Sequence, residues 1–258
     1  MTLRRPITTL LCAGAFLMTG VACSDDEEPT AVEDTSSTTS ASTTTTTEPR
    51  PDGGQDIRDF DIDDQLEPGT YFIDPDEDPS TPLTVTYEIP EGWSGWIGAA
   101  KFSPEGHTAL TIVTVDNLVT EACEDPAPQD PAVGPTVDDL ATALSELSPF
   151  ELTEPPTVVT LLGYEGKHLM ITVPDLEVTG SGDTAEYADC IDGNMHSWID
   201  SGGEPFFGYN AEPGRYDEYW ILDVDGTRLM ISINSSPAMP PEDLEEVRAI
   251  IDSIQFEA

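Results

Sequence analysis

Residues 219–233 read YWILDVDGTRLMISI and predict a β-hairpin. Tyr219 to Val224 and Thr227 to Ile233 are rich in the apolar and β-branched residues that strands favour. Between them lies Asp225-Gly226, a dipeptide that suits a tight type I′ turn because both residues tolerate positive φ. This stretch is the clearest sign that the fold is built on antiparallel strands.

Earlier parts of the chain show the same pattern of strand-like segments bounded by turn residues. Leu83 to Ile89 alternates apolar and polar residues and stops at Pro90, as expected for a strand with one wet face. Two further hairpins are predicted, one from Trp96–Phe102 and Ala109–Val115 around residues 103–106, the other from Thr157–Leu162 and Lys167–Val173 around residues 163–166.

Two helices complete the predicted fold. Thr136 is a suitable N-cap, followed by acidic residues that favour the positive end of the helix dipole. Pro240 and Pro241 open the second helix. The apolar faces are Val137, Leu140, Ala141, Leu144 and Leu147 in the first helix and Leu244, Val247, Ile250, Ile251 and Ile254 in the second. We therefore expect an α+β class, an antiparallel sheet with helices packed on it.

The N-terminus is typical of an export signal. Arg4 and Arg5 precede an uncharged, largely apolar run that ends at Cys23. Gly20-Val21-Ala22-Cys23 resembles a bacterial lipobox, although the commonest form has Leu at the position of Gly20. We predict a lipoprotein signal peptide over 1–22 and lipidation of Cys23. Plain secretion and an uncleaved anchor are the alternatives.

Residues 23–65 are predicted to be a disordered tether. They are dominated by Ser, Thr and acidic residues, which cannot bury enough apolar surface to offset their conformational entropy. A bare spacer is the favoured interpretation, and an O-glycosylated stalk is the alternative. Residues 66–258 then form a single globular domain, lipid-anchored on the extracytoplasmic face of the cell membrane.

Charge limits the possible partners. The chain has 9 Lys plus Arg against 51 Asp plus Glu, a net charge of -42. Such a surface repels nucleic acid and anionic headgroups, so no nucleic acid partner is expected. The predicted partners are the membrane, through the lipid anchor, and an envelope ligand or protein of unknown identity.

Three short motifs resemble a known family. They are Ile89-Pro90-Glu91-Gly92-Trp93, the hairpin Trp220–Leu229, and Ala249–Phe256 near the C-terminus. In these segments the chain is similar to actinobacterial lipoproteins with a PsbP-like α/β sandwich, of the LpqN type. The resemblance implies a fold and a surface location, and it carries over no catalytic residues.

Two cysteines remain in the exported domain. With Cys12 removed in the signal and Cys23 lipidated, Cys123 and Cys190 form an even pair in an oxidising compartment. We predict that they form a disulfide. Two free, unreactive thiols are the alternative.

Motifs for catalysis and metal binding are incomplete. Gly92-Trp93-Ser94-Gly95-Trp96 approaches the nucleophile elbow of serine hydrolases, but its last Gly is replaced and a strand follows. The histidines, His107, His168 and His196, have no metal-ligand spacing, and we expect them to be solvated or hydrogen-bonded. The acidic stretches 59–64 and 74–78 do not match an EF-hand. We therefore predict no catalytic residues, no metal site and no cofactor.

Aromatic residues gather in a loop-rich region between residues 204 and 220. Packing over the sheet is the favoured interpretation, and a ring surface for a ligand is the alternative. The residues that would face such a ligand are Phe206, Phe207, Tyr209 and Tyr216. The leading hypothesis is a non-catalytic domain that binds or scaffolds something in the cell envelope. An extracellular hydrolase acting on envelope polymers or esters, and a calcium-dependent adhesion or sensing module, are the alternatives.

Overall fold

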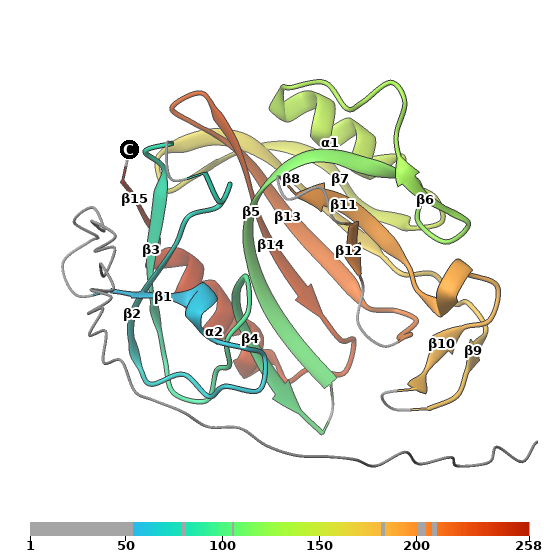
Figure 1. The fold of residues 1–258 in the computed structure, drawn as a ribbon, viewed down its shortest axis with the longest axis horizontal. Coiled ribbons are helices and arrows are strands. Elements are labelled where there is room, and N and C mark those ends of the chain that lie inside the picture. The colour runs from blue at the N-terminus through green and yellow to red at the C-terminus, as the bar shows by residue number, and fades with distance from the viewer. Residues whose placement is uncertain are drawn as a thin grey trace, which may run out of the picture. The chain divides into compact units, whose positions relative to one another are not determined.

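The computed structural model describes residues 54–78, 81–104, 106–181, 184–200, 205–207 and 211–257. β-Strands are the main secondary structure of these residues, and two α-helices accompany them, which confirms the mixed α+β class (Figure 1). The expected signal peptide, Cys23 and the tether up to residue 53 lie outside the described residues. In the described part of the chain, no helix is long and apolar enough to span a membrane.

The main sheet has nine strands, and every pairing in it is antiparallel. Its order is β12-β11-β5-β14-β13-β8-β7, with β4 and β6 also paired to β5. The long strand β5 can hold four partners because it runs for 16 residues. The strands are β4 (Gly98–Ser103), β5 (Gly106–Glu121), β6 (Asp125–Pro128), β7 (Glu151–Leu161), β8 (Tyr164–Thr172), β11 (His196–Asp200), β12 (Pro205–Phe207), β13 (Tyr216–Val224) and β14 (Thr227–Ser235).

A second sheet has four strands in the order β1-β2-β3-β15. The pair β1–β2 is parallel and the other two pairs are antiparallel. A separate two-stranded sheet joins β9 and β10. These elements and the short 3-10 helices are β1 (Gln55–Asp56), η1 (Ile57–Asp59), β2 (Gly69–Ile73), β3 (Thr84–Ile89), β9 (Val178–Thr179), β10 (Glu186–Tyr187), η3 (Ile191–Gly193) and β15 (Gln255–Glu257).

The folded domain begins before Leu66, where the sequence analysis placed its start. Gln55 and Asp56 pair with β2, and Ile57 in η1 is fully buried in the core. The composition of residues 54–65 did not indicate a folded segment, because only a few of these residues are apolar. Their burial depends on pairing with strands further along the chain, so residues 54–65 belong to the domain and not to the tether.

The main sheet is covered on both faces. One face packs against α2 (Pro241–Asp252) and the four-stranded sheet, around core residues such as Tyr87, Ile231 and Val247. The other face packs against α1 (Val137–Ser145), around Leu144 and Ile221. This alternation follows from the period of two along each strand, which sends successive side chains to opposite faces.

Local signals placed both helices correctly. Thr136 caps α1 through a capping box, in which its hydroxyl accepts the Asp139 N–H and the Asp139 carboxylate accepts the Thr136 N–H. Pro241 is the first residue of α2. Leu147 and Ile254, predicted on the apolar faces, lie just past the helix ends and are buried there.

The hairpins also follow the predictions, with one shift in position. Asp225 and Gly226 form the turn between β13 and β14, with φ of 51° and 94°. In the β7–β8 hairpin the turn residues are Leu162 and Gly163, not residues 163–166. Tyr164 instead starts β8 and packs edge-to-face on Phe256.

The predicted disulfide between Cys123 and Cys190 is present. It joins the turn after β5 to the residue before η3, and Ile191 donates its N–H to the Cys123 carbonyl at 2.8 Å. A small separate cluster of apolar residues surrounds this junction, including Val119, Tyr187 and Ile199. The bond therefore fastens this satellite cluster to the end of β5.

Candidate functional site

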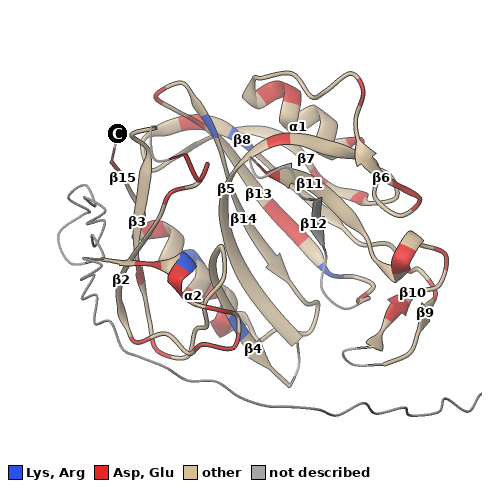
Figure 2. Ribbon diagram, viewed as in Figure 1, with Lys and Arg blue, Asp and Glu red and all other residues tan. Residues whose placement is uncertain are grey.

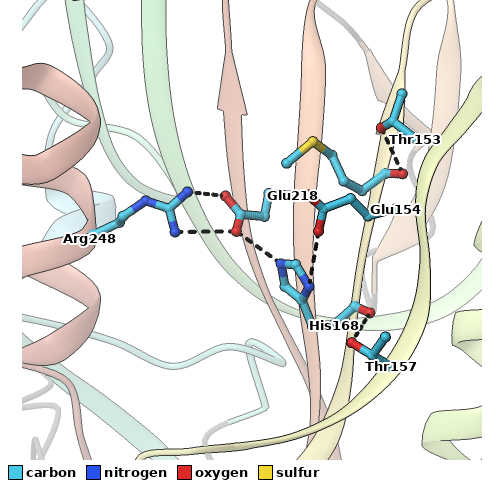
Figure 3. A network of polar contacts seen from close by, with 7 residues as sticks. Thr153, Glu154, Thr157, His168, Glu218 and Arg248 are labelled. Carbon is cyan, nitrogen blue, oxygen red and sulfur yellow. Dashed lines mark hydrogen bonds and ion pairs between the residues drawn. The ribbon is translucent and has the colours of Figure 1, made fainter. Parts of the chain in front are cut away.

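The most distinctive polar feature is a bridge between α2 and the main sheet. Glu218 in β13 lies on the face that is turned towards α2, and its side chain is only 5% exposed. Arg248 in α2 donates to both of its carboxylate oxygens, from Nη2 to Oε2 at 2.6 Å and from Nη1 to Oε1 at 3.3 Å (Figure 3). The bidentate geometry provides both charge neutralisation and a fixed orientation for the guanidinium.

His168 extends this bridge towards the edge of the sheet. Its Nε2 lies 2.9 Å from Glu218 Oε1, and its Nδ1 lies 3.8 Å from Glu154 in β7 (Figure 3). The register of β8 against β13 places His168 opposite Trp220, and the two rings are tilted with centroids 5.1 Å apart. Four side chains from four elements thus form a row that we call the Arg248–Glu154 row.

The row is buried at its centre and open at its ends. Side chains of Arg248 and Glu154 are 49% and 56% exposed, whereas His168 is 16% exposed. Both Glu218 oxygens are already occupied by Arg248 and His168. Glu218 is therefore placed to hold the guanidinium, while the exposed nitrogens of Arg248 can meet a ligand from solvent.

Tyr216 lies on the same face of β13 as Glu218 and Trp220 because the three residues are spaced by two. Its ring is half-buried, and burial raises the pKa of its hydroxyl. The charges of Glu218 and Arg248 both act on this hydroxyl. The part of the sheet next to the row therefore combines two aromatic side chains with a fixed cation.

The predicted aromatic residues have different outcomes. Tyr216 stands beside the row, and Trp220 packs partly into the core on the same face. Phe206 and Phe207 lie in the short edge strand β12, and their side chains are outside what the structure describes. Tyr209 lies outside the described residues, so the ring surface that would include it stays a prediction.

The sequence predicts histidines that are solvated or hydrogen-bonded, and it does not single out Glu218 or Arg248. A usable signal was present, because Asp217 and Glu218 are consecutive acids in a central strand whose two faces are both covered. Each must be paired, since an unpaired buried charge is costly. Glu218 pairs with Arg248, and Asp217 lies 3.8 Å from Arg215 on the opposite face.

Asp217 belongs to a second polar group, which is fully inside the protein. Asn234 donates to Asp217 and lies 2.8 Å from Nε2 of His107. Burial raises the pKa of Asp217 and lowers the pKa of His107.

Ser236 is the possible nucleophile of this inner group. It lies 3.3 Å from His107 Nδ1 and donates to Glu212 at 2.7 Å. Its side chain also accepts the His107 backbone N–H, and the residue is only 1% exposed. A nucleophile must reach its substrate, so we assign this group a structural role in joining β5 to the end of β14.

The other motifs considered in the sequence are also part of the fold. Ser94 is buried and accepts a hydrogen bond from Gln65 at 2.6 Å, beside the fully buried Trp93. In the part of the chain that the structure describes, no group of three or more His, Cys, Asp or Glu residues is arranged to hold a metal ion. No family model, curated protein or solved structure matches this chain.

Proposed function

We propose that this chain is an extracytoplasmic lipoprotein, anchored through Cys23, whose domain binds or scaffolds a component of the cell envelope without catalysis. Its fold and location would be those implied by its resemblance to the PsbP-like lipoproteins of the LpqN type. The ligand would bind at the solvent-exposed end of the Arg248–Glu154 row, at Arg248 and beside Tyr216. One observation carries this proposal. The buried carboxylate of Glu218 holds the guanidinium of Arg248 in place, while the Arg248 side chain stays half exposed next to Tyr216.

The chemistry of the row favours recognition over reaction. A fixed guanidinium supplies several oriented donors, and a neighbouring aromatic ring supplies an apolar surface. The carboxylate of Glu218 could act as a base, but both of its oxygens are already in contact with Arg248 and His168. The high negative charge of the chain disfavours polyanionic ligands, so a neutral or weakly charged envelope polymer fits best.

Sedimentation with protein-free cell-wall polysaccharide tests the binding function. The mature chain would carry Cys23→Ser, so that a lipid does not confound the result. We expect this protein to co-sediment, and the double variant Glu218→Gln/Arg248→Gln to lose binding while remaining folded, because paired amides can still bond to each other. Arg58→Gln is the matched control, since it removes a cation that pairs with Glu77 outside the row. Equal sedimentation of all three proteins would contradict the site.

The anchor needs a separate experiment. Full-length protein expressed with its own signal in an actinobacterial host should gain the mass of a diacylglycerol and partition into detergent. Cys23→Ala should lose both properties. An unlipidated chain that starts at Cys23 in the medium would contradict the anchored location.

A further inference from the structure

The last strand of the main sheet, β7, has an outer edge with which no strand of the described residues pairs. It pairs with β8 on one side and is the terminal strand on the other. Its residues from Glu151 to Thr160 are mostly exposed, and the side chain of Val158 is 74% exposed. Such an edge presents unpaired backbone groups to which another extended chain can be added.

The register shows which backbone groups of β7 point outwards. Leu161 and Tyr164 flank the two-residue turn, so they form a pair that exchanges hydrogen bonds within the hairpin. Bonded and non-bonded pairs alternate along an antiparallel ladder. Val159 and Thr157 therefore also bond to β8, whereas Val158 and Thr160 direct their N–H and C=O groups away from the sheet.

Prolines limit the length of this edge. Pro155 and Pro156 interrupt β7, and the pairing with β8 is irregular from Leu152 to Thr157. Proline has no N–H to donate, and bulges deflect a strand from further pairing. The part of β7 that can pair with another strand is thus the regular stretch Thr157–Leu161. Its length suits a short peptide segment and not continuous edge-to-edge association of sheets.

A hollow lies beside this edge, on the face of the sheet that carries α1. Its volume is about 470 Å³, and its walls include Val158, Val137 at the start of α1, and Gly166. In a bonded pair, opposite side chains project from the same face. A residue that pairs with Val158 would therefore direct its side chain over Val158 and towards the hollow.

Charge indicates what kind of chain would bind. Glu165, Asp138 and Asp223 line the hollow, and Glu154 lies close to the edge on the opposite face. Two cations, Lys167 and Arg228, also line the hollow; Lys167 is paired with Asp138 at 2.8 Å, and Arg228 donates to backbone carbonyls, including that of Val115 at 2.7 Å. Every described Lys and Arg has a carboxylate or carbonyl partner; these cations are Arg58, Lys101, Lys167, Arg215, Arg228 and Arg248. The edge therefore attracts cations.

We propose that β7 binds a short basic peptide segment as an added antiparallel strand, with an apolar side chain opposite Val158 directed into the hollow beside α1. Backbone hydrogen bonds to Val158 and Thr160 provide the affinity, and the hollow and its acidic rim select the sequence. Apart from Glu154, which belongs to β7 and to the Arg248–Glu154 row, this site uses other residues than the row, so it goes beyond the function proposed above.

The probe is a fluorescein-labelled, end-capped peptide, Lys-Lys-Thr-Leu-Thr-Lys-Lys, titrated onto the full mature domain and followed by fluorescence anisotropy. N-methylation of the central Leu removes the N–H that would bond to β7, and we expect it to weaken binding by about tenfold or more. N-methylation of a flanking Thr is the matched control, because that N–H points away from β7 and binding should be retained. A copy with Glu in place of every Lys should not bind.

Protein variants test the same edge. Val158→Pro removes an outward N–H without breaking the ladder to β8, so it should abolish peptide binding with little change in thermal midpoint. Val158→Thr keeps the N–H and should retain most of the binding. Glu218→Gln/Arg248→Gln should bind the peptide as the parent does, whatever its effect on polysaccharide. Absence of peptide binding, or equal binding by the two N-methylated peptides or by Val158→Pro, would overturn the proposal.

Discussion

Arg248 and Glu218 hold α2 to the main sheet through two hydrogen bonds between the guanidinium and the carboxylate, at 2.6 and 3.3 Å. The two residues are 30 positions apart, and the carboxylate lies on the inner side of α2 with almost no solvent contact. Removal of the cation would leave a buried charge whose remaining hydrogen-bond partner among the described residues is His168. The bridge therefore has a structural consequence that can be separated from ligand binding.

Truncation of the bridge should destabilise the domain. We expect Arg248→Ala to lower the free energy of unfolding by about 2 kcal/mol, less than the roughly 3–5 kcal/mol for breaking fully buried pairs, because Arg248 is half exposed. Urea denaturation measures the change. In a Glu218→Gln background the same truncation should cost clearly less, and equal costs in the two backgrounds would show that the two side chains are not coupled.

Loss of the disulfide should loosen the satellite cluster first. The sequence separation of Cys123 and Cys190 is 67 residues, for which the loop-entropy model gives about 4 kcal/mol of stabilisation. We expect Cys123→Ala/Cys190→Ala to lower the denaturation midpoint and to increase amide exchange in β10 and β11 before the central strands. Two alkylatable thiols in the exported parent protein, or an unchanged midpoint in the variant, would contradict this.

Asp74 should make the stability of the domain depend on pH. Burial, together with the neighbouring carboxyl of Asp76, raises the pKa of Asp74 from 3.8 to about 6. Between these two pKa values the folded state binds more protons than the unfolded state, so the free energy of unfolding falls as pH rises. This deficit in stability is complete above about pH 6.

Asp74→Asn removes this deficit, since an amide does not ionise. We expect the variant to melt at a higher temperature than the parent near neutral pH, with the difference shrinking as pH falls towards 4. Asp63→Asn, a change of the same kind in an exposed loop, is the control. A constant difference across the pH range would assign the effect to packing and not to ionisation.

Local signals were sufficient for much of the fold. Asp225-Gly226, the Thr136 cap and Pro241 each act within a few residues, so the hairpin and both helices could be predicted. The strands at residues 55–56, 69–73 and 196–200 could not, because they are short and depend on distant partners. β11, for example, is fixed by pairing with the far end of β5 and by the disulfide beside it.

The candidate site was harder to predict than the fold for the same reason. His168, Glu218 and Arg248 are separated by 50 and 30 positions, so no spacing rule connects them. Their meeting requires the register of β8 against β13 and the position of α2 over the sheet. The consecutive acids Asp217 and Glu218 indicated that partners were needed, but not which cations would supply them.

Salt should stabilise this protein, because its surface is left almost wholly anionic. The described cations are paired within the fold, and the remaining carboxylates are spread over strands, helices and loops (Figure 2). With a net charge of -42, the compact state concentrates mutual repulsion that the expanded chain relieves. Counterions at about 1 M shorten the screening length to roughly 3 Å and weaken this repulsion.

We therefore expect the thermal midpoint to rise steadily with NaCl, as measured by circular dichroism. Arg248→Ala removes a positive charge and so adds to the net repulsion. Its thermal midpoint should rise with NaCl by less than this added repulsion alone would predict, because salt screens the buried Glu218 poorly. A midpoint that stays level or falls in strong NaCl would show that attraction within pairs such as Lys101–Asp243, at 2.5 Å, outweighs the repulsion across the surface.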